Sequence, residues 1–261
     1  MSKKEVKEHV ILYLDVLGYR ELVLNCAKYG KTENDYLHKI YSLMEDLSEY
    51  IDKRNQMLDD KYAESNLKMT NFKWRMFSDN IVFFAPADTD VEMYNLGSNL
   101  LYGLSLFLFS YKKADLFFRG AITRGLLYYS DELGILYGSG LIKAYDIECE
   151  IAKYPRIIID ECFNPDGLLV GLERNGDGVG YLNYLSLAYN IATNERNLEP
   201  NSNEARKLFE PYISNYSQAI SAALKRYDKE PKVYDKYIYL AKYINGFCRY
   251  TGYDEFIIVL P

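Results

Sequence analysis

The chain has 261 residues, 49% of them hydrophobic and 26% charged, which is typical of a globular protein with a substantial core. Its formal net charge of −6 argues against sequence-independent binding to nucleic acid, because such binding depends on Lys and Arg side chains that neutralise phosphates. No long linker or repeat divides the sequence, so we expect residues 1–261 to form a single domain.

Signals for targeting and for soft-metal sites are scarce. The N-terminus is charged rather than apolar, and the most apolar predicted helix, residues 96–109, is too short to span a bilayer. We therefore expect a cytoplasmic protein with no membrane partner. The four cysteines are widely spaced without a CxxC motif and there are two histidines, which argues against a zinc site or a Cys–His nucleophile.

The first predicted element is a strand at residues 10–14. Its five consecutive apolar residues are typical of a strand covered on both faces, and the run ends at Asp15. The chain then turns at Gly18 and enters a helical stretch, where backbone N–H groups near a helix N-terminus can receive a phosphate. Asp15 is thus a candidate cation ligand beside a candidate phosphate site.

Two helices are predicted next, at residues 20–28 and 34–54. The second has an apolar stripe typical of a helix that packs on a core. Its members are Leu37, Ile40, Tyr41, Met44, Leu47 and Ile51. Polar stretches at 52–67 and 194–203 are predicted as loops.

Residues 73–85 predict a β-hairpin with Asp79 in its turn. Apolar residues alternate on both sides of Ser78, Asp79 and Asn80, which are residues that favour chain reversal. A carboxylate in this position is either a turn residue that bonds its own backbone or a ligand for a hard cation. If the strands that carry Asp15 and Asp79 are neighbours, both carboxylates can bind a divalent cation that also contacts the phosphates of a nucleoside triphosphate.

The rest of the chain alternates helices and strands. A helix begins at Asp88 or Thr89, whose side chains can cap it, and runs to about residue 111. Strands at 116–122 and 125–130 follow, separated by Arg124 and Gly125. The remaining predicted elements are a glycine-led helix within 134–155, a strand at 156–160, a turn at 175–178 before a strand at 180–184, helices at 202–226 and 232–249, and a final strand at 255–260.

Several strings resemble a known family. YLDVLGY at 13–19, FSDNIVFF at 77–84, FRGAITRG at 118–125, YGSGLIKAYDIE at 137–148 with AKYPRII at 152–158, and KYIYLAKYIN at 236–245 are similar, in this order, to strings of the bacterial pyrimidine cyclases of the Pycsar anti-phage systems. The resemblance implies an α+β fold of the class III nucleotidyl cyclase type, with a ferredoxin-like βααββαβ core and C-terminal helical additions. It further implies a homodimer that makes a cyclic nucleotide for a separate effector.

The resemblance also implies roles for particular residues. Asp15 and Asp79 would hold two Mn²⁺ or Mg²⁺ ions, with the Val16 carbonyl as a further ligand, while Gly18 and Tyr19 would lie against the substrate. Ile142 and Asp146 stand where familiar adenylyl cyclases carry a transition-state Asn and Arg, which is a departure from the family pattern. The cations expected to neutralise the triphosphate are therefore Lys143, Arg119 and Arg124.

Arg75 falls where class III cyclases keep a residue that selects the base. Its guanidinium offers donors and no acceptor, which suits the carbonyl edge of a pyrimidine better than the amino group of adenine. We favour UTP as substrate and keep CTP as the alternative. Arg75 as a solvated strand residue or a triphosphate contact stays open, as do a non-catalytic nucleotide sensor and a protein in which both aspartates only cap and turn.

Overall fold

The computed structural model describes residues 4–62, 72–110, 116–163 and 171–260. Four strands form the first half of its sheet, and their order is β2-β3-β1-β4 with every neighbouring pair antiparallel. Helices α2 and α3 connect them, so that the chain runs β1-α2-β2-β3-α3-β4. This connection and strand order are those of a ferredoxin-like core, which confirms the predicted fold class. The bounds are β1 (Lys7–Val16), α2 (Glu33–Tyr62), β2 (Lys73–Phe77), β3 (Asn80–Pro86), α3 (Asp90–Ser110) and β4 (Phe118–Ser130).

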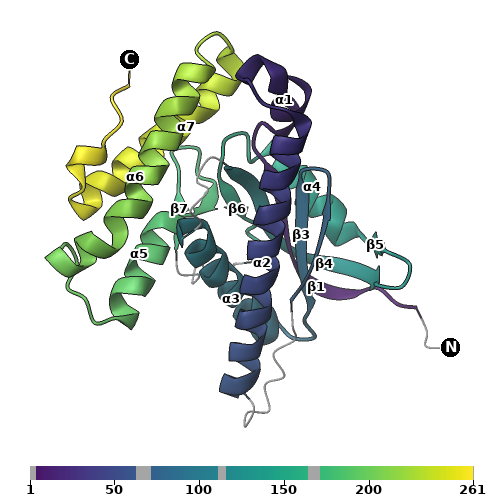
Figure 1. Cartoon of the computed structure of the whole chain (residues 1–261). Coiled ribbons are helices and arrows are strands. Elements are labelled where there is room, and N and C mark those ends of the chain that lie inside the picture. The colour runs from purple at the N-terminus through teal and green to yellow at the C-terminus, as the bar shows by residue number, and fades with distance from the viewer. Residues whose placement is uncertain (1–3, 63–71, 111–115, 164–170, 261) are drawn as a thin grey trace.

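The alternation of side chains along β1 divides the core between the two faces of the sheet. Leu12 and Leu14 pack with residues of α2 and α3 on one face, which these helices cover in Figure 1. Ile11 and Tyr13 point to the other face and pack with Ala144 of α4 (Ser139–Glu150). Because both faces are covered, the strand is apolar at consecutive positions, as its sequence predicts.

Helix α4 lies unusually close to β4, and two glycines make this possible. A Cβ atom added to Gly125 would stand 2.6 Å from the Cα atom of Gly140, which is closer than real Cβ contacts come. A short strand, β5 (Ile135–Tyr137), precedes α4 and pairs with the end of β4, where the two project from the body of the molecule (Figure 1).

The second half of the chain extends the sheet and adds helices. The sheet continues from β4 through β6 (Ile157–Ile159) and β8 (Gly180–Leu182) to β7 (Leu172–Arg174). The helices lie together beyond this edge in Figure 1, and their buried residues form a second core cluster. They are α5 (Tyr184–Glu195), α6 (Asn203–Arg226) and α7 (Pro231–Thr251). The predicted C-terminal helical additions are therefore confirmed.

Three predicted boundaries in the first half of the chain are wrong. The first helix is short, with α1 (Tyr19–Leu24) followed by a 3-10 turn (Cys26–Tyr29), whereas α2 continues through much of the expected loop at 52–67. The two strands expected around Arg124 are one strand, because Arg124 and Gly125 pair with Val10 and His9 of β1 without interruption.

Two further expectations fail in the second half. No helix was expected at 184–195, where the side chain of Asn183 caps α5 by accepting a hydrogen bond from the Ser186 N–H. The expected strand at 255–260 is absent from the described residues and gives way to a 3-10 turn (Asp254–Phe256). There the side chain of Asn245 takes the place of a neighbouring strand, since its amide bonds both the N–H and the carbonyl of Ile258, at 2.7 and 2.8 Å.

Other expectations are met. Thr89 and Glu92 bond each other's backbone at the start of α3, which is the expected cap. The expected apolar stripe of α2 is confirmed for Leu47, which is buried, and for Ile40, Met44 and Ile51, which pack against the core. Leu37 and Tyr41 are exposed. Among the described helices, none has both the length and the apolar character needed to cross a membrane.

Candidate active site

The turn that carries Asp79 lies beside the end of β1. Ser78 and Asp79 form a two-residue turn between β2 and β3, and Ser78 adopts a positive φ of 58°. The Val16 N–H donates to the Asp79 carbonyl at 3.0 Å, just after Asp15 pairs with Asn80 in β3. The structure therefore brings together the two aspartates that the sequence predicts as a pair.

Asp15 shares an arginine with a second, deeply buried carboxylate. The Nε atom of Arg119 donates to Oδ2 of Asp15 at 2.8 Å and lies 2.6 Å from Oε1 of Glu148 on α4. The second contact lacks hydrogen-bond geometry, so Oε1 of Glu148 has no hydrogen-bond partner among the described residues, although Glu148 is only 2% exposed. A buried carboxylate oxygen without a partner is costly, which marks this cluster as a place for a further cation or donor.

The charges of the cluster also indicate a place for a further cation. Burial raises the pKa of Asp15 to about 6, the hydrogen bond from Arg119 opposes this rise, and the charges of Glu148 and Asp79 add to it. Lys236 of α7 stands close enough to interact with this cluster, and burial lowers its pKa. Three carboxylates thus face two cations among the described residues that interact here.

Asp79 has neighbours of its own. The hydroxyl of Tyr13 donates to Oδ1 of Asn80 at 2.6 Å, and Nδ2 of Asn80 donates to Oδ1 of Asp79 at 3.1 Å. This chain of hydrogen bonds links the Asp79 carboxylate to Tyr13 of β1. Sequence analysis singled out neither Tyr13 nor Glu148 as a site residue. The signal for Tyr13 was its position two residues before Asp15, on the same face of the strand.

The donor set fits a hard divalent cation. Carboxylate oxygens are what Mg²⁺ and Mn²⁺ prefer, and such ions commonly take one or two carboxylates and complete their shell with water and phosphate oxygens. The described residues contain no group of three or more His, Cys, Asp or Glu side chains that could hold a metal. Asp15 and Asp79 stay the predicted side-chain ligands. The Val16 carbonyl stays a predicted further ligand.

The predicted phosphate turn is only partly as expected. Gly18 has a φ of 75°, which permits the tight turn, but α1 has six residues and offers a short helix dipole. Tyr19 packs its side chain against the core cluster beneath α2 and α3. A substrate contact by Gly18 or Tyr19 stays a prediction.

Arg75 lies on the same face of the sheet as Asp15. It pairs with Val82, which pairs in turn with Tyr13, so all three face α4, whereas Trp74 and Met76 pack toward the opposite core. The Arg75 side chain is 40% exposed and forms an ion pair with Asp131, in the turn that links β4 and β5. A base that binds Arg75 would have to share or displace this carboxylate.

Two other predicted cations lie elsewhere in this chain. Arg124 pairs with Val10, on the face of α2 and α3, and donates to Asp90 at 2.7 Å. Lys143 forms an ion pair with Asp160 at 2.5 Å, beyond the end of β6. Among the three arginine and lysine candidates, the structure brings only Arg119 to the two aspartates.

Asp15 should make the protein less stable at neutral pH when no metal is bound. Its folded pKa of about 6 is above the unfolded value of about 3.9, so the folded state holds more protons between these values and stability falls as pH rises through them. Asp15→Asn should therefore raise the free energy of unfolding by about 1–2 kcal/mol at pH 7.5 in EDTA and by close to zero at pH 4.

Urea unfolding at the two pH values measures this difference. Asp228→Asn, which removes an exposed carboxylate, is the matched control and should change stability by less than about 0.5 kcal/mol at either pH. A loss of stability in Asp15→Asn at pH 7.5 would contradict the interpretation.

Comparisons with known proteins find only distant structural similarity. No protein-family model and no curated protein matches the chain. Among solved structures, it is similar to a bacterial light-regulated adenylyl cyclase, with 10% identity, a TM-score of 0.42 and coverage of 73% of this chain and 57% of that one. It is also similar to the adenylyl cyclase CyaB from P. aeruginosa, with 12% identity, a TM-score of 0.38 and coverage of 69% and 95%. At these values the likeness is one of fold and assigns neither substrate nor residue roles.

Proposed function

We propose that this chain is a nucleotide cyclase that converts a pyrimidine nucleoside triphosphate, UTP in preference to CTP, into its 3′,5′-cyclic monophosphate and pyrophosphate. The observation that carries the proposal is the meeting of Asp15 and Asp79 at one end of a ferredoxin-like sheet, beside a buried carboxylate oxygen of Glu148 that has no hydrogen-bond partner among the described residues. By the resemblance of its sequence strings, the product would be a second messenger of anti-phage defence, read by a separate effector.

In the proposed reaction, the ribose 3′ oxygen bonds to the α-phosphorus, the bond from that phosphorus to the leaving pyrophosphate breaks, and the hydroxyl proton is lost to solvent. Two Mn²⁺ or Mg²⁺ ions held by Asp15 and Asp79 would supply positive charge to the attacking and leaving oxygens. The protein has little acid–base work in such a transfer, so its residues chiefly position groups and balance charge. Tyr13 and Asn80 serve this purpose by orienting Asp79.

Arg119 is the cation best placed to meet the triphosphate. It donates to Asp15, and Glu148 lies within reach of the same Nε atom. A cation bound to Asp15 would weaken the ion pair between Asp15 and the Arg119 guanidinium. The Glu148 carboxylate would then still balance the positive charge of Arg119 and keep its side chain in place. Glu148 is thus proposed as a positioning residue, and it acts through Arg119.

The two aspartates provide the first test. Asp15→Asn and Asp79→Asn should each lower turnover of UTP in Mn²⁺ by more than about 100-fold, since loss of a ligand should exceed the 10–100-fold cost of losing a group that only supports one. The measurement is the release of pyrophosphate by the purified protein with each of the four triphosphates, and Asp228→Asn is the control. Full activity in either variant would end the metal proposal.

A non-catalytic nucleotide sensor is the second candidate. It is favoured by α4, where Ile142 and Asp146 carry no positive charge and Lys143 forms an ion pair with Asp160, so that none of them supplies a cation to Asp15 in the same chain. Binding of UTP with Mn²⁺ in calorimetry, without pyrophosphate release under any condition, would identify the sensor and reject the cyclase.

The choice of base is tested at the pair formed by Arg75 and Asp131. Arg75→Ala should lower pyrimidine turnover by about 10-fold or more and leave Mn²⁺ affinity unchanged, because an unpaired base edge is disfavoured strongly. Asp131→Asn should keep or raise the preference, since it releases the guanidinium from its ion pair. If Arg75→Ala retains the order of preference among the four triphosphates, or if the parent protein prefers ATP or GTP, the assignment of the base is wrong.

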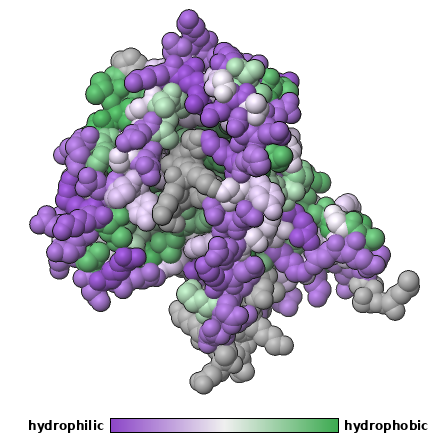
Figure 2. Space-filling view, viewed as in Figure 1, coloured by the Kyte–Doolittle hydropathy of each residue, from purple (hydrophilic) through white to green (hydrophobic). Residues whose placement is uncertain are grey.

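A homodimer would bring residues of a second chain to each site. Figure 2 shows hydrophobic residues on the projecting end of the molecule, where β4 and β5 lie, within a largely hydrophilic face. Large apolar side chains are exposed on these strands and on neighbouring α4. They are Leu126, Ile135, Tyr137, Ile142 and Tyr145. Exposed large apolar side chains on neighbouring elements are typical of a contact with another protein.

Ile142→Glu should therefore shift the protein from dimer to monomer in sedimentation and lower turnover in parallel. Leu37→Glu is the matched control, because Leu37 is exposed to a similar degree, 60%, on α2 at the other face. A monomeric parent protein with full activity would contradict the shared site.

A further inference from the structure

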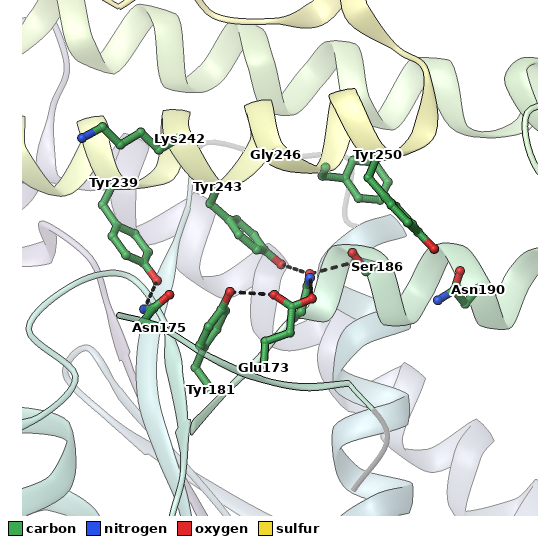
Figure 3. A pocket seen from close by; sticks show the side chains of 12 residues that line it. Glu173, Asn175, Tyr181, Ser186, Asn190, Tyr239, Lys242, Tyr243, Gly246 and Tyr250 are labelled. Atoms are coloured by element: carbon green, nitrogen blue, oxygen red, sulfur yellow. Dashed lines mark hydrogen bonds between the residues drawn. The ribbon is translucent and has the colours of Figure 1, made fainter. Parts of the chain in front are cut away.

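A large cavity lies away from the two aspartates, between the far edge of the sheet and the added helices. It has a volume of about 650 Å³ and is lined by residues of β7, β8, α5 and α7. β8 is three strands away from β1 in the sheet, and neither Asp15 nor Asp79 lines the cavity, although α7 carries both part of the lining and Lys236. Figure 3 shows its two walls, with α7 above and the strands and α5 below.

The upper wall is one face of α7. Tyr239, Tyr243, Gly246 and Tyr250 recur at helical spacing and line the cavity together. A glycine inside a helix lowers helix stability. A Cβ at Gly246 would meet no atom within 4 Å, so packing does not require a glycine at this position. The glycine instead leaves backbone without a side chain between two tyrosines of the lining.

The lower wall presents a carboxylate that the chain already holds in position. The Tyr181 hydroxyl donates to one oxygen of Glu173 at 2.8 Å, and the amide of Asn183 donates to the other. Asn183 is fixed in turn by the Tyr243 hydroxyl, which donates to its Oδ1 at 2.9 Å (Figure 3). Glu173 is exposed, and each carboxylate oxygen can accept a second hydrogen bond, so the pair is ready for hydroxyl or amino donors.

Two further groups are available to a ligand. The side chain of Asn190 on α5 lies across from Tyr250 in Figure 3 and makes no hydrogen bond within the described residues, and its amide offers a donor and an acceptor in one plane. Lys242 is exposed at the other end of the cavity, and within the described part of the lining it is the one cation and Glu173 the one carboxylate. The lining as a whole is therefore neutral, aromatic and rich in hydrogen-bonding groups.

We propose that this cavity binds a nucleoside. The base would lie on the bare backbone at Gly246, between Tyr243 and Tyr250, with its polar edge toward Asn190. The ribose hydroxyls would donate to Glu173, and Lys242 is available to a phosphate when one is present. A planar ring and a hydroxylated sugar in one molecule account for both the aromatic wall and the fixed carboxylate, and the proposal does not depend on the proposed cyclase activity.

Calorimetry in EDTA tests the proposal, because the site at Asp15 and Asp79 is then without metal. The probes are adenosine, guanosine, cytidine and uridine, their 5′-monophosphates and their 3′,5′-cyclic monophosphates. At least one nucleoside should bind with a dissociation constant below about 1 mM. Binding of the phosphates that weakens in Lys242→Ala, with nucleoside binding unchanged, would identify a nucleotide as the occupant, whereas equal binding of all three forms would identify the nucleoside itself.

Variants at Gly246 locate the binding. Gly246→Leu places a side chain in the open space over the helix and should weaken binding at least about 10-fold, the scale of losing a stacking surface, as should Tyr250→Ala. Gly246→Ala is the matched control, and it should stabilise the helix with a smaller effect on affinity. No binding of any nucleoside at 5 mM, loss of binding in Asp79→Asn instead of Gly246→Leu, or binding of maltose in place of nucleosides would each overturn the proposal.

Discussion

The pairing of β1 with β3 is the constraint on which the candidate site depends. Its register sets Asp15 opposite Asn80, and the backbone bond from Val16 to Asp79 continues that pairing into the turn. A shift of one residue would move Asp15 to the face covered by α2 and α3, since neighbouring residues of a strand point to opposite faces. The register of this pairing therefore fixes the place of the carboxylate.

The charges at this site are balanced by residues from distant parts of the chain. Asp15 ends a strand, Arg119 comes from β4, Glu148 from α4 and Lys236 from α7. Burial makes each charge interact strongly, and a partly satisfied cluster is less stable than an apolar one of the same shape. A buried charge cluster of this kind destabilises the fold, and such unfavourable arrangements occur in proteins at functional sites. The cavity beside α7 shows no such imbalance, because its hydrogen bonds are largely complete.

Sequence patterns predicted the parts of this fold that depend on local periodicity. The strand before Asp15, the hairpin around Asp79 and helices α6 and α7 all have apolar residues at the spacing of their element, and the structure has them at nearly the predicted positions. The failures involve long-range contacts. Arg124 and Gly125 look like a break but pair with β1, and the last residues bond to Asn245 rather than to a strand. Within the site, the two aspartates could be predicted, whereas the role of Glu148 depends on how α4 crosses β4, which no local pattern contains.

The contact of Gly125 with Gly140 gives α4 a fixed point of support on the sheet. Glu148 lies eight residues further along this helix, about 12 Å from the contact at the usual rise. A side chain at either glycine would tilt the helix about its N-terminal end, and the displacement would grow with distance along the axis. Natural variation at these two glycines, which touch no charged group of the site, would therefore change the geometry around Asp15 more than many substitutions nearer to it.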